Sequence, residues 1–154
     1  MDKRSARFET ARRWLIFWTP FIGIGAAAGG VSMILDPSGK TLHMDGMLPF
    51  FPKLPLADVL FRDFLFSGFA LLLVNGLTNL TAAALLLRRK PLGALLGGVF
   101  GITLMLWICI QFYMFPLNFM STAYFVFSLC QAITGFAAWR LLPKEEGKTD
   151  RAAS

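Results

Sequence analysis

Hydrophobic residues along this chain form four long runs that contain no charged side chain and no histidine. Each run is 21 to 24 residues long, and a helix needs about 20 apolar residues to cross a hydrocarbon core about 30 Å thick. Charged residues lie in the two tails and between the runs, and most of the prolines lie between the runs, where helices stop. The pattern therefore predicts four transmembrane helices, over residues 14–35, 64–87, 92–115 and 119–139.

The connections between these helices differ in length. Residues 88–91 and 116–118 are short, which places consecutive helices side by side and antiparallel. Residues 36–63 are the long connection, and the stretch 47–56 within it holds three prolines among apolar residues. Because proline disrupts a regular helix, we expect this stretch to lie at the membrane interface or to fold over the bundle as a lid. The predicted fold is an all-α membrane protein, an antiparallel four-helix transmembrane bundle with one long, partly apolar extracytoplasmic loop.

Two signals define the ends of the long loop. The D-P-S-G sequence at 36–39 stops the first helix, because proline cannot continue the hydrogen-bond ladder and glycine permits a turn. At the other end we expect residues 58–63 to begin a short helix, with Asp58 and Arg62 as a pair four residues apart. A site at the outer rim built from these two residues and Asp63 is one interpretation. A solvated charge cluster is the simpler one.

The basic residues are distributed unevenly outside the runs. Of the 15 Lys and Arg residues, five precede residue 14, three lie in 88–91 and four follow residue 139. The long loop holds the other three, and the connection 116–118 holds none. Lys and Arg concentrate in cytoplasmic segments. We therefore predict that both termini and the 88–91 connection face the cytoplasm.

Length and composition leave room for one domain. The chain has 154 residues, is 56% hydrophobic and has a mean hydropathy of +0.60, which is more apolar than a soluble domain. We expect residues 1–13 to be a basic cytoplasmic tail, 14–142 the transmembrane domain, and 143–154 a disordered cytoplasmic tail. The net charge of +6 does not indicate nucleic-acid binding, because the aromatic residues lie inside the spans.

The N-terminal region also has features of a signal peptide. Basic residues precede an apolar stretch, and an Ala-Ala-Ala sequence at 26–28 is similar to a cleavage site. The apolar character continues to Leu35, which is longer than a signal-peptide core. We therefore interpret the segment as a retained first span.

Small residues recur at helical spacing in two of the predicted helices. Gly93, Gly97 and Gly101 are four residues apart in the third run, as are Gly25 and Gly29 in the first. Helices in membranes associate through close contact at such residues. We interpret both glycine ridges as helix-packing surfaces rather than ligand sites.

Uncharged polar residues inside the runs are the candidate functional residues. They fall on helix faces that we expect to meet in the bundle interior, because buried amides need partners. At 1.5 Å of rise per residue they are predicted to form three tiers at increasing depth from the outer surface. The tiers are Gln111 with Tyr124, Asn75 with Gln131, and Asn79 with Thr134. They are interpreted either as hydrogen-bonded contacts between helices or as a polar path or pocket.

Asp, Glu, Lys, Arg and His are absent from the predicted spans. This excludes an intramembrane proton relay, ion-coupling site or voltage sensor of the usual kinds. The sole histidine, His43, lies in the long loop beside two methionines and an aspartate, which is a weak ligand set, so we expect no metal and no cofactor. Cys109 and Cys130 lie at depths too different for a disulfide and are interpreted as buried hydrophobic residues.

Three sequence features resemble a widespread group of small bacterial four-span membrane proteins. They are a Gly-Gly pair before the D-P-S-G turn within 29–39, the stretch 64–76, and Trp-Ile-Cys-Ile-Gln at 107–111. The group has no established activity, so the resemblance implies the architecture and a bacterial cytoplasmic (inner) membrane, and it implies no site. The long loop of this chain is longer than the resemblance leads one to expect.

Three function classes follow from these observations. The first is a non-enzymatic accessory or interaction subunit, whose glycine ridges meet another membrane protein or a second copy of the chain. The second is a small carrier or channel for a neutral or amphipathic solute or lipid, which would use the polar tiers. The third, an enzyme, is not expected, because no nucleophile–base pair and therefore no candidate catalytic residue is visible. The lipid bilayer is the one partner that the composition itself predicts.

Overall fold

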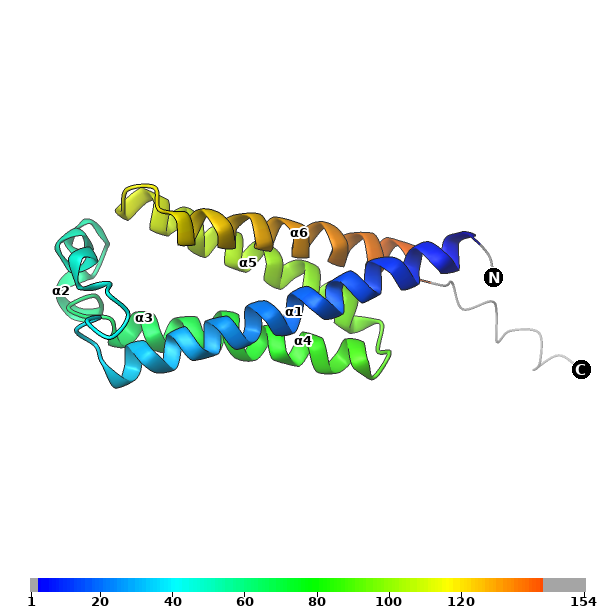
Figure 1. The fold of residues 1–154 in the computed structure, drawn as a ribbon, viewed down its shortest axis with the longest axis horizontal. Coiled ribbons are helices and arrows are strands. Elements are labelled where there is room, and N and C mark those ends of the chain that lie inside the picture. Colours follow the sequence, from blue (N-terminus) through cyan, green and yellow to red (C-terminus); the bar gives the residue numbers. More distant parts are fainter. Residues whose placement is uncertain (1–2, 143–154) are drawn as a thin grey trace, which may run out of the picture.

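The computed structural model of the chain describes residues 3–142, and every regular element in that range is a helix (Figure 1). Four helical segments in this range are long and apolar enough to span a membrane. They are Lys3–Leu35, Leu65–Leu87, Leu92–Met114 and Phe119–Leu141. The prediction of an all-helical chain with four possible membrane spans is therefore confirmed. The predicted tail 143–154 lies outside the described residues.

The first helix, α1, covers Lys3–Leu35 and begins well before the predicted apolar span. Residues 3–13 are thus helical and continuous with the apolar part of α1, and their place in a cytoplasmic tail stays a prediction. The residues before Trp14 include good helix formers such as Ala, Arg and Glu, and Arg12 pairs with Glu9 at 3.3 Å one turn away. The change at Trp14 is thus a change of polarity along one continuous helix.

A carboxylate organises the turn that follows α1. Asp36 Oδ1 accepts hydrogen bonds from the backbone N and the hydroxyl of Ser38, and Oδ2 accepts from the N and hydroxyl of Thr41, at 2.6 to 3.2 Å. These bonds, from the Ser38 hydroxyl first and then from Thr41, lower the pKa of Asp36 well below its ordinary range. Gly39 supplies the left-handed backbone that this turn needs, with φ of 74°.

The second span consists of three consecutive helical segments. They are α3 (Leu65–Ala70), a π-helical segment η2 (Leu71–Leu77) and α4 (Thr78–Leu87). A π-helical segment is rare and is found frequently at functional sites. Asn75 lies inside η2, so the wider helical turn occurs next to one of the predicted polar residues.

The third and fourth spans are α5 (Leu92–Met114) and α6 (Phe119–Leu141). The turn between them ends at Asn118, whose side-chain Oδ1 accepts a 2.9 Å hydrogen bond from the backbone N of Ser121 and so caps α6. Arg4 donates hydrogen bonds of 3.2 Å to the carbonyls of Arg140 and Leu142 at the other end of α6. Both ends of α6 are thus fixed by side chains.

The long loop contains more helix than the sequence analysis allows. Residues Asp45–Lys53 form a 3-10 helix, η1, which includes two prolines. Helices of this type occur as short connecting segments, whereas a regular α-helix was excluded by the prolines. The predicted helix over 58–63 is a single turn, α2 (Ala57–Leu60). Arg62 donates to the backbone carbonyl of Asp58 rather than pairing with its carboxylate, so the predicted ion pair is wrong.

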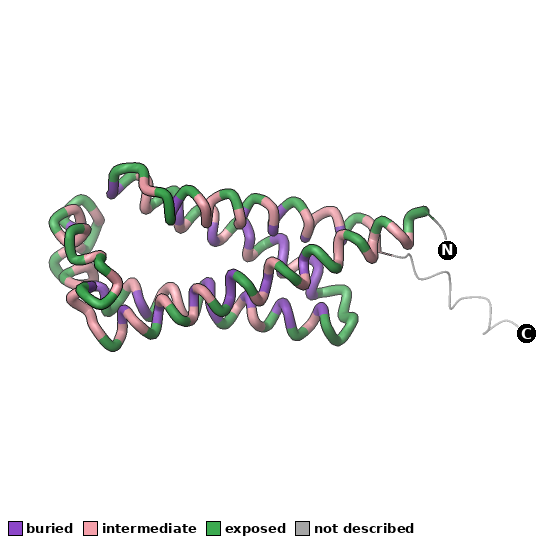
Figure 2. Tube along the Cα trace, viewed as in Figure 1, coloured by how far each residue is buried: buried purple, intermediate pink, exposed green. Residues whose placement is uncertain are grey.

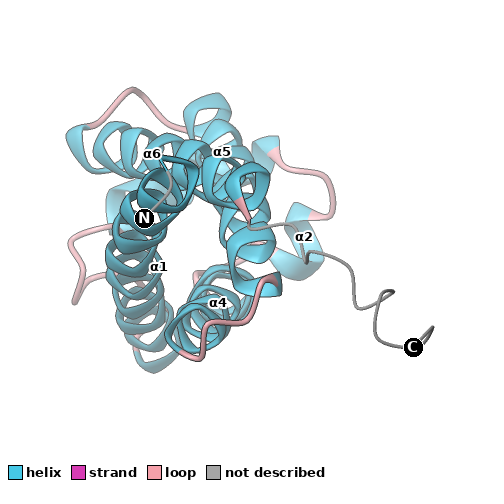
Figure 3. Ribbon diagram, turned by 90° about the vertical axis from the view of Figure 1, so that its right-hand side faces the viewer, coloured by secondary structure: helices cyan, strands magenta, loops and turns pink. Residues whose placement is uncertain are grey.

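The four spans pack tightly at one end and separate toward the other (Figures 1 and 2). We call the end that carries Lys3 and the turn 88–91 the basic end, and the end that carries residues 36–63 the loop end. Viewed along its length, the bundle places α4 and α6 on opposite sides with α1 between them (Figure 3). α5 packs most extensively against α6, and α1 contacts both α6 and the second span.

The tight half is held by one residue from each span. Leu15, Leu86, Ala94 and Ala138 form a buried cluster near the basic end. Large apolar side chains cover the outer faces of the helices and are exposed, for example Ile24, Leu106 and Ile133, each at 60% or more. An apolar exterior over helices of this length is typical of a lipid-facing surface.

Candidate functional site

A cavity of about 400 Å³ lies at the loop end, where α1 and the second span separate from α5 and α6. We call it the loop-end cavity. Most of its lining is apolar, and no Asp, Glu, Lys or Arg side chain contributes to it. The lining comprises Ile22, Gly25, Ala26, Gly29 and Met33 of α1, Leu42, His43, Met44 and Met47 of the loop, Leu71 of η2, Leu104, Trp107, Ile108 and Gln111 of α5, then Asn118, Met120, Ser121 and Tyr124.

Small residues on α1 create space in this cavity. A Cβ added at Gly29 would meet only a methyl group of Leu71, at 3.4 Å, which is ordinary contact. A Cβ added at Gly25 would lie 2.7 Å from the Tyr124 hydroxyl, so this hydroxyl sits directly over the glycine. Gly25 and Gly29 therefore line a cavity wall, and the helix contact on α1 falls at Gly30, where an added Cβ would lie 2.7 Å from the carbonyl oxygen of Gly68.

The glycine ridge of α5 has the packing role that its spacing predicts. An added Cβ would lie 2.8 Å from the backbone N of Leu86 at Gly93, and 3.0 Å from Leu15 at Gly97. At Gly101 it would lie 2.6 Å from the backbone N of Ala132. The contacts at Gly93 and Gly101 are to backbone and leave no room for a side chain, whereas at Gly97 the Leu15 side chain would have to shift. The ridge is therefore occupied by helices of the same chain.

Six residues with hydrogen-bonding side chains contribute to the cavity wall. Trp107 Nε1 is buried and has no hydrogen-bond partner among the described residues. Gln111 Oε1 accepts a 2.9 Å hydrogen bond from Ser121 Oγ, which joins α5 to α6. Tyr124, His43 and Asn118 complete the set. Trp107 lines the cavity, and a buried N–H without a partner is costly, so this indole is the candidate donor for a bound molecule.

An aromatic cluster packs against the loop residues Leu42, Met44 and Met47, which line the cavity. Phe51 is 2% exposed, and its ring lies 5.0 Å from that of Phe64 and 6.2 Å from that of Phe115. Lys53 Nζ donates a 3.5 Å hydrogen bond to the carbonyl of Met114, and Phe50 packs edge-on against Phe115. The loop is thereby attached to the end of α5 and covers the bundle.

A buried amide network lies on the other side of the cavity, toward the basic end. Gln131 Nε2 donates to Asn79 Oδ1 and to the carbonyl of Gly97, both at 2.7 Å. Asn79 Nδ2 in turn donates to the backbone carbonyl of Asn75 at 2.8 Å. The network links α4, α5 and α6, and none of its amide side chains lines the loop-end cavity. We call this network of Asn75, Asn79 and Gln131 the floor, because its buried side chains lie between the cavity and the basic end.

The predicted tiers are assembled differently in the structure. Gln131 pairs with Asn79 and not with Asn75, whose two side-chain amide atoms are buried without a hydrogen-bond partner. Thr134 donates to the carbonyls of Cys130 and Gln131 in its own helix and joins no tier. The prediction used only depth along each helix, which puts Asn75 level with Gln131. Depth does not include the wider turn of the π-helical segment around Asn75 or the angle at which the helices cross.

Other predicted candidates occupy local roles. Asp63 Oδ1 accepts a 2.9 Å hydrogen bond from the backbone N of Leu65, the first residue of α3. This carboxylate is therefore used in a local contact with the backbone. Cys109 is exposed and not buried as expected, because it lies on the outer face of α5, and Cys130 is half-buried. Both cysteines are free thiols. Among residues 3–142, no three His, Cys, Asp or Glu side chains gather where they could hold a metal.

Sequence reasoning missed the contribution of Trp107 to the site. The hydropathy pattern counts tryptophan as an apolar residue, although its indole N–H needs a partner when buried. That need is the signal in the motif at 107–111 that identifies Trp107 as a candidate. Comparison with known protein families, with curated proteins and with solved structures gives no match.

Proposed function

We propose that this chain is a multi-pass membrane protein that binds a small, uncharged amphipathic molecule in the loop-end cavity. The observation that carries the proposal is the cavity itself, which has apolar walls, a few hydrogen-bonding groups and no Asp, Glu, Lys or Arg side chain. Its volume of about 400 Å³ falls within the range of small-molecule sites, about 300–1,000 Å³. Charged ligands are disfavoured, since no opposite charge in the wall offsets their desolvation.

The polar groups suggest how such a molecule would be held. The indole N–H of Trp107 has no partner within the described chain, and it would donate to a carbonyl or ester oxygen of the ligand. Gln111 is already oriented by Ser121 and presents its amide to the same cavity. The apolar part of the ligand would contact Met33, Leu71 and Ile108. The polar groups would set orientation, and apolar burial would supply most of the affinity.

The orientation of the chain is part of the proposal. The basic end carries the Lys and Arg residues of the N-terminal region and of the turn 88–91, so we place it at the cytoplasmic face. The loop-end cavity then lies in the outer half of the membrane. A bacterial cytoplasmic membrane follows from the family resemblance and stays a prediction.

Binding is better supported than conduction. The amide network and the Leu15 cluster pack the half of the bundle between the cavity and the basic end. A channel needs a continuous path, and this half would have to open to provide one. The proposal is therefore a binding protein for a lipid-like molecule, which is the narrower form of the carrier interpretation.

The accessory-subunit interpretation loses its strongest argument. It relied on glycine ridges free to meet a partner, but the α5 ridge contacts Leu15, Leu86 and Ala132 of the same chain. The α1 pair Gly25 and Gly29 lines the cavity. A partner would have to use the large apolar side chains of the helix exteriors, which look the same as an ordinary lipid-facing surface.

The test uses a substitution that fills the cavity. Gly29→Phe places a large ring in the cavity from its α1 wall, and Ala28→Phe places the same ring on the exposed face of α1. Each protein is purified in mild detergent, and bound small molecules are extracted and identified by mass spectrometry. We expect one class of amphipathic molecule to co-purify with the wild type and with Ala28→Phe, and to be lost from Gly29→Phe.

Three results would count against this function. Equal recovery of the molecule from both variants would place it on the lipid-facing exterior. Absence of any bound molecule from the wild type, with a protein partner recovered instead, would favour the accessory subunit. A folded Gly29→Phe protein that retains the molecule would exclude the loop-end cavity as its site. Helicity and elution volume of each variant show whether it is folded.

A further inference from the structure

A second, smaller pocket of about 220 Å³ lies at the basic end. It is formed by the start of α1, the end of α4 and the beginning of α5, and Arg12, Arg89 and Lys90 line it. We propose that this basic-end pocket binds the phosphate group of an anionic phospholipid. The proposal concerns a different site and a different ligand charge from the loop-end cavity, so each can fail without the other.

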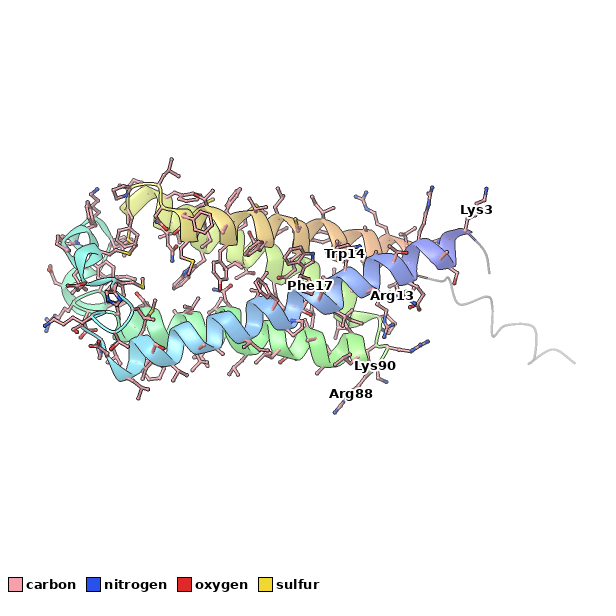
Figure 4. All side chains as sticks on the ribbon, in the orientation of Figure 1. Lys3, Arg13, Trp14, Phe17, Arg88 and Lys90 are labelled. Atoms are coloured by element: carbon pink, nitrogen blue, oxygen red, sulfur yellow. The ribbon has the colours of Figure 1, made fainter. Side chains whose placement is uncertain are left out.

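The charge of the pocket is positive and incompletely paired. Its one acidic side chain, Glu9, pairs with Arg12 at 3.3 Å, and this is the sole ion pair among residues 3–142. Arg89 and Lys90 therefore have no carboxylate partner in that range. Figure 4 shows Lys90 and its neighbour Arg88 extending from the turn at the basic end. Two cations without a partner on one short turn favour a phosphate.

Arg12 presents a donor that is already positioned. Its Nη2 donates a 2.8 Å hydrogen bond to the carbonyl of Leu86 at the end of α4. Its side chain is only 12% exposed, and its Nε is buried without a hydrogen-bond partner in the described part of the chain. An oriented guanidinium that lines the pocket is suited to an anionic oxygen, because little side-chain freedom remains to be lost on binding.

The beginning of α5 adds a further favourable feature. This helix of 23 residues starts at Leu92, its N-cap residue Pro91 provides no side-chain cap, and both Pro91 and Ala94 line the pocket. The N-terminus of a helix carries a partial positive charge, which favours phosphate. The backbone amides of Gly93 and Ala94 already donate to the carbonyls of Lys90 and Pro91, so the contribution of this terminus is its dipole. The turn also holds Arg89 in a left-handed conformation, with φ of 55°, which non-glycine residues adopt infrequently.

The position of the pocket favours a lipid over a soluble phosphate. It lies where the charged part of α1 meets the apolar part that begins at Trp14. Trp14 is 55% exposed and Trp139 is 40% exposed, and exposed tryptophans gather at the headgroup level of membranes. Acyl chains attached to a phosphate at this level would lie along the apolar faces of the helices. Basic pockets between transmembrane helices bind lipid headgroups in this way.

The test compares two double variants with the same loss of charge. Arg89→Gln with Lys90→Gln removes the two unpaired cations of the pocket, and Arg13→Gln with Arg88→Gln removes two cations outside its lining. Arg12 is left intact, because its bond to Leu86 supports the fold. Each detergent-solubilised protein is titrated with phosphatidylglycerol or phosphatidylcholine, and bound lipid is counted by native mass spectrometry.

We expect the wild type and the Arg13/Arg88 variant to bind phosphatidylglycerol more tightly than phosphatidylcholine. In the Arg89/Lys90 variant the affinity for phosphatidylglycerol should fall about tenfold or more, the effect of losing a charge-assisted hydrogen bond. An equal loss in both variants, or no loss in either, would overturn the site. Displacement of phosphatidylglycerol by millimolar inorganic phosphate would show that the pocket takes soluble phosphate, and would overturn the lipid assignment.

Discussion

Replacing Gln131 with leucine tests whether the buried amide network stabilises the bundle. Leucine has a similar volume but no amide, so the change removes the 2.7 Å hydrogen bonds to Asn79 Oδ1 and to the carbonyl of Gly97. Asn79 Oδ1 then loses the one donor that it has among the described residues. The Gly97 carbonyl is less affected, because it is also positioned within the backbone of α5.

The expected magnitude follows from these contacts. Hydrogen bonds between transmembrane helices contribute about 0.6 kcal/mol on average and at most about 1.7 kcal/mol. Two such bonds give a loss of about 1–3 kcal/mol. Gln131 Oε1 is itself buried without a partner, and its removal offsets part of that loss. We therefore expect Gln131→Leu to lower the free energy of unfolding by about 1–2 kcal/mol.

Reversible unfolding by sodium dodecyl sulfate in mixed micelles, followed by tryptophan fluorescence, measures this difference. Thr134→Val is the matched control, since Thr134 lies near Gln131 on α6 and its hydroxyl bonds only to carbonyls of its own helix. We expect its effect to stay below about 0.5 kcal/mol. A cycle with Asn79→Leu isolates the pair. Additive effects of Asn79→Leu and Gln131→Leu would refute the network, as would equal stability of Gln131→Leu and the control.

Two further predictions address packing and the loop. Gly135→Ala should destabilise the bundle by about 1–3 kcal/mol, because the added methyl group collides with the backbone of Gly98. Gly46→Ala is the control, since Gly46 has open space around it, and the same unfolding assay should show a much smaller effect for this variant. Because hydrogen bonds lower the pKa of Asp36, its contribution to the turn is complete above the ordinary value of 3.8 and is lost as the pH falls toward the depressed value. Hydrogen exchange at the Thr41 amide should therefore be slow at pH 5 and accelerate, relative to other loop amides, in more acidic buffer; an unchanged relative rate would show that the carboxylate does not hold the turn.

The four apolar helices of membrane-spanning length could be predicted from the sequence, because hydropathy and helix length are local properties. A charged side chain is costly in hydrocarbon wherever the helix lies, so runs without charge define spans independently of tertiary contacts. The ends are equally local: the D-P-S-G sequence at 36–39 ends α1, and Asn118 begins α6. The early start of α1 at Lys3 was missed because hydropathy reports polarity, whereas helix formation also depends on propensity.

The candidate site could not be predicted to the same extent, because it depends on how the helices cross. Gly25 and Gly29 have the same spacing as Gly97 and Gly101, yet the first pair lines a cavity and the second contacts neighbouring helices. Spacing tells which residues share a face but not how far away the opposite helix lies. The separation of the two helix pairs toward the loop end decides that distance, and no local pattern in the sequence encodes it.

The arrangement of floor and cavity separates stability from binding, and this gives a last prediction. Neither Gln131 nor Asn79 lines the loop-end cavity, so Gln131→Leu should weaken the bundle and still retain the bound amphipathic molecule. Gly29→Phe should do the opposite, since it fills a cavity where an added Cβ meets a single methyl group and should release the molecule with little change in unfolding. Measuring bound molecule and unfolding free energy for both variants tests this division. If Gln131→Leu lost the molecule while remaining folded, the floor and the cavity would be one functional unit, and the polar tiers would have to be considered a path through the membrane after all.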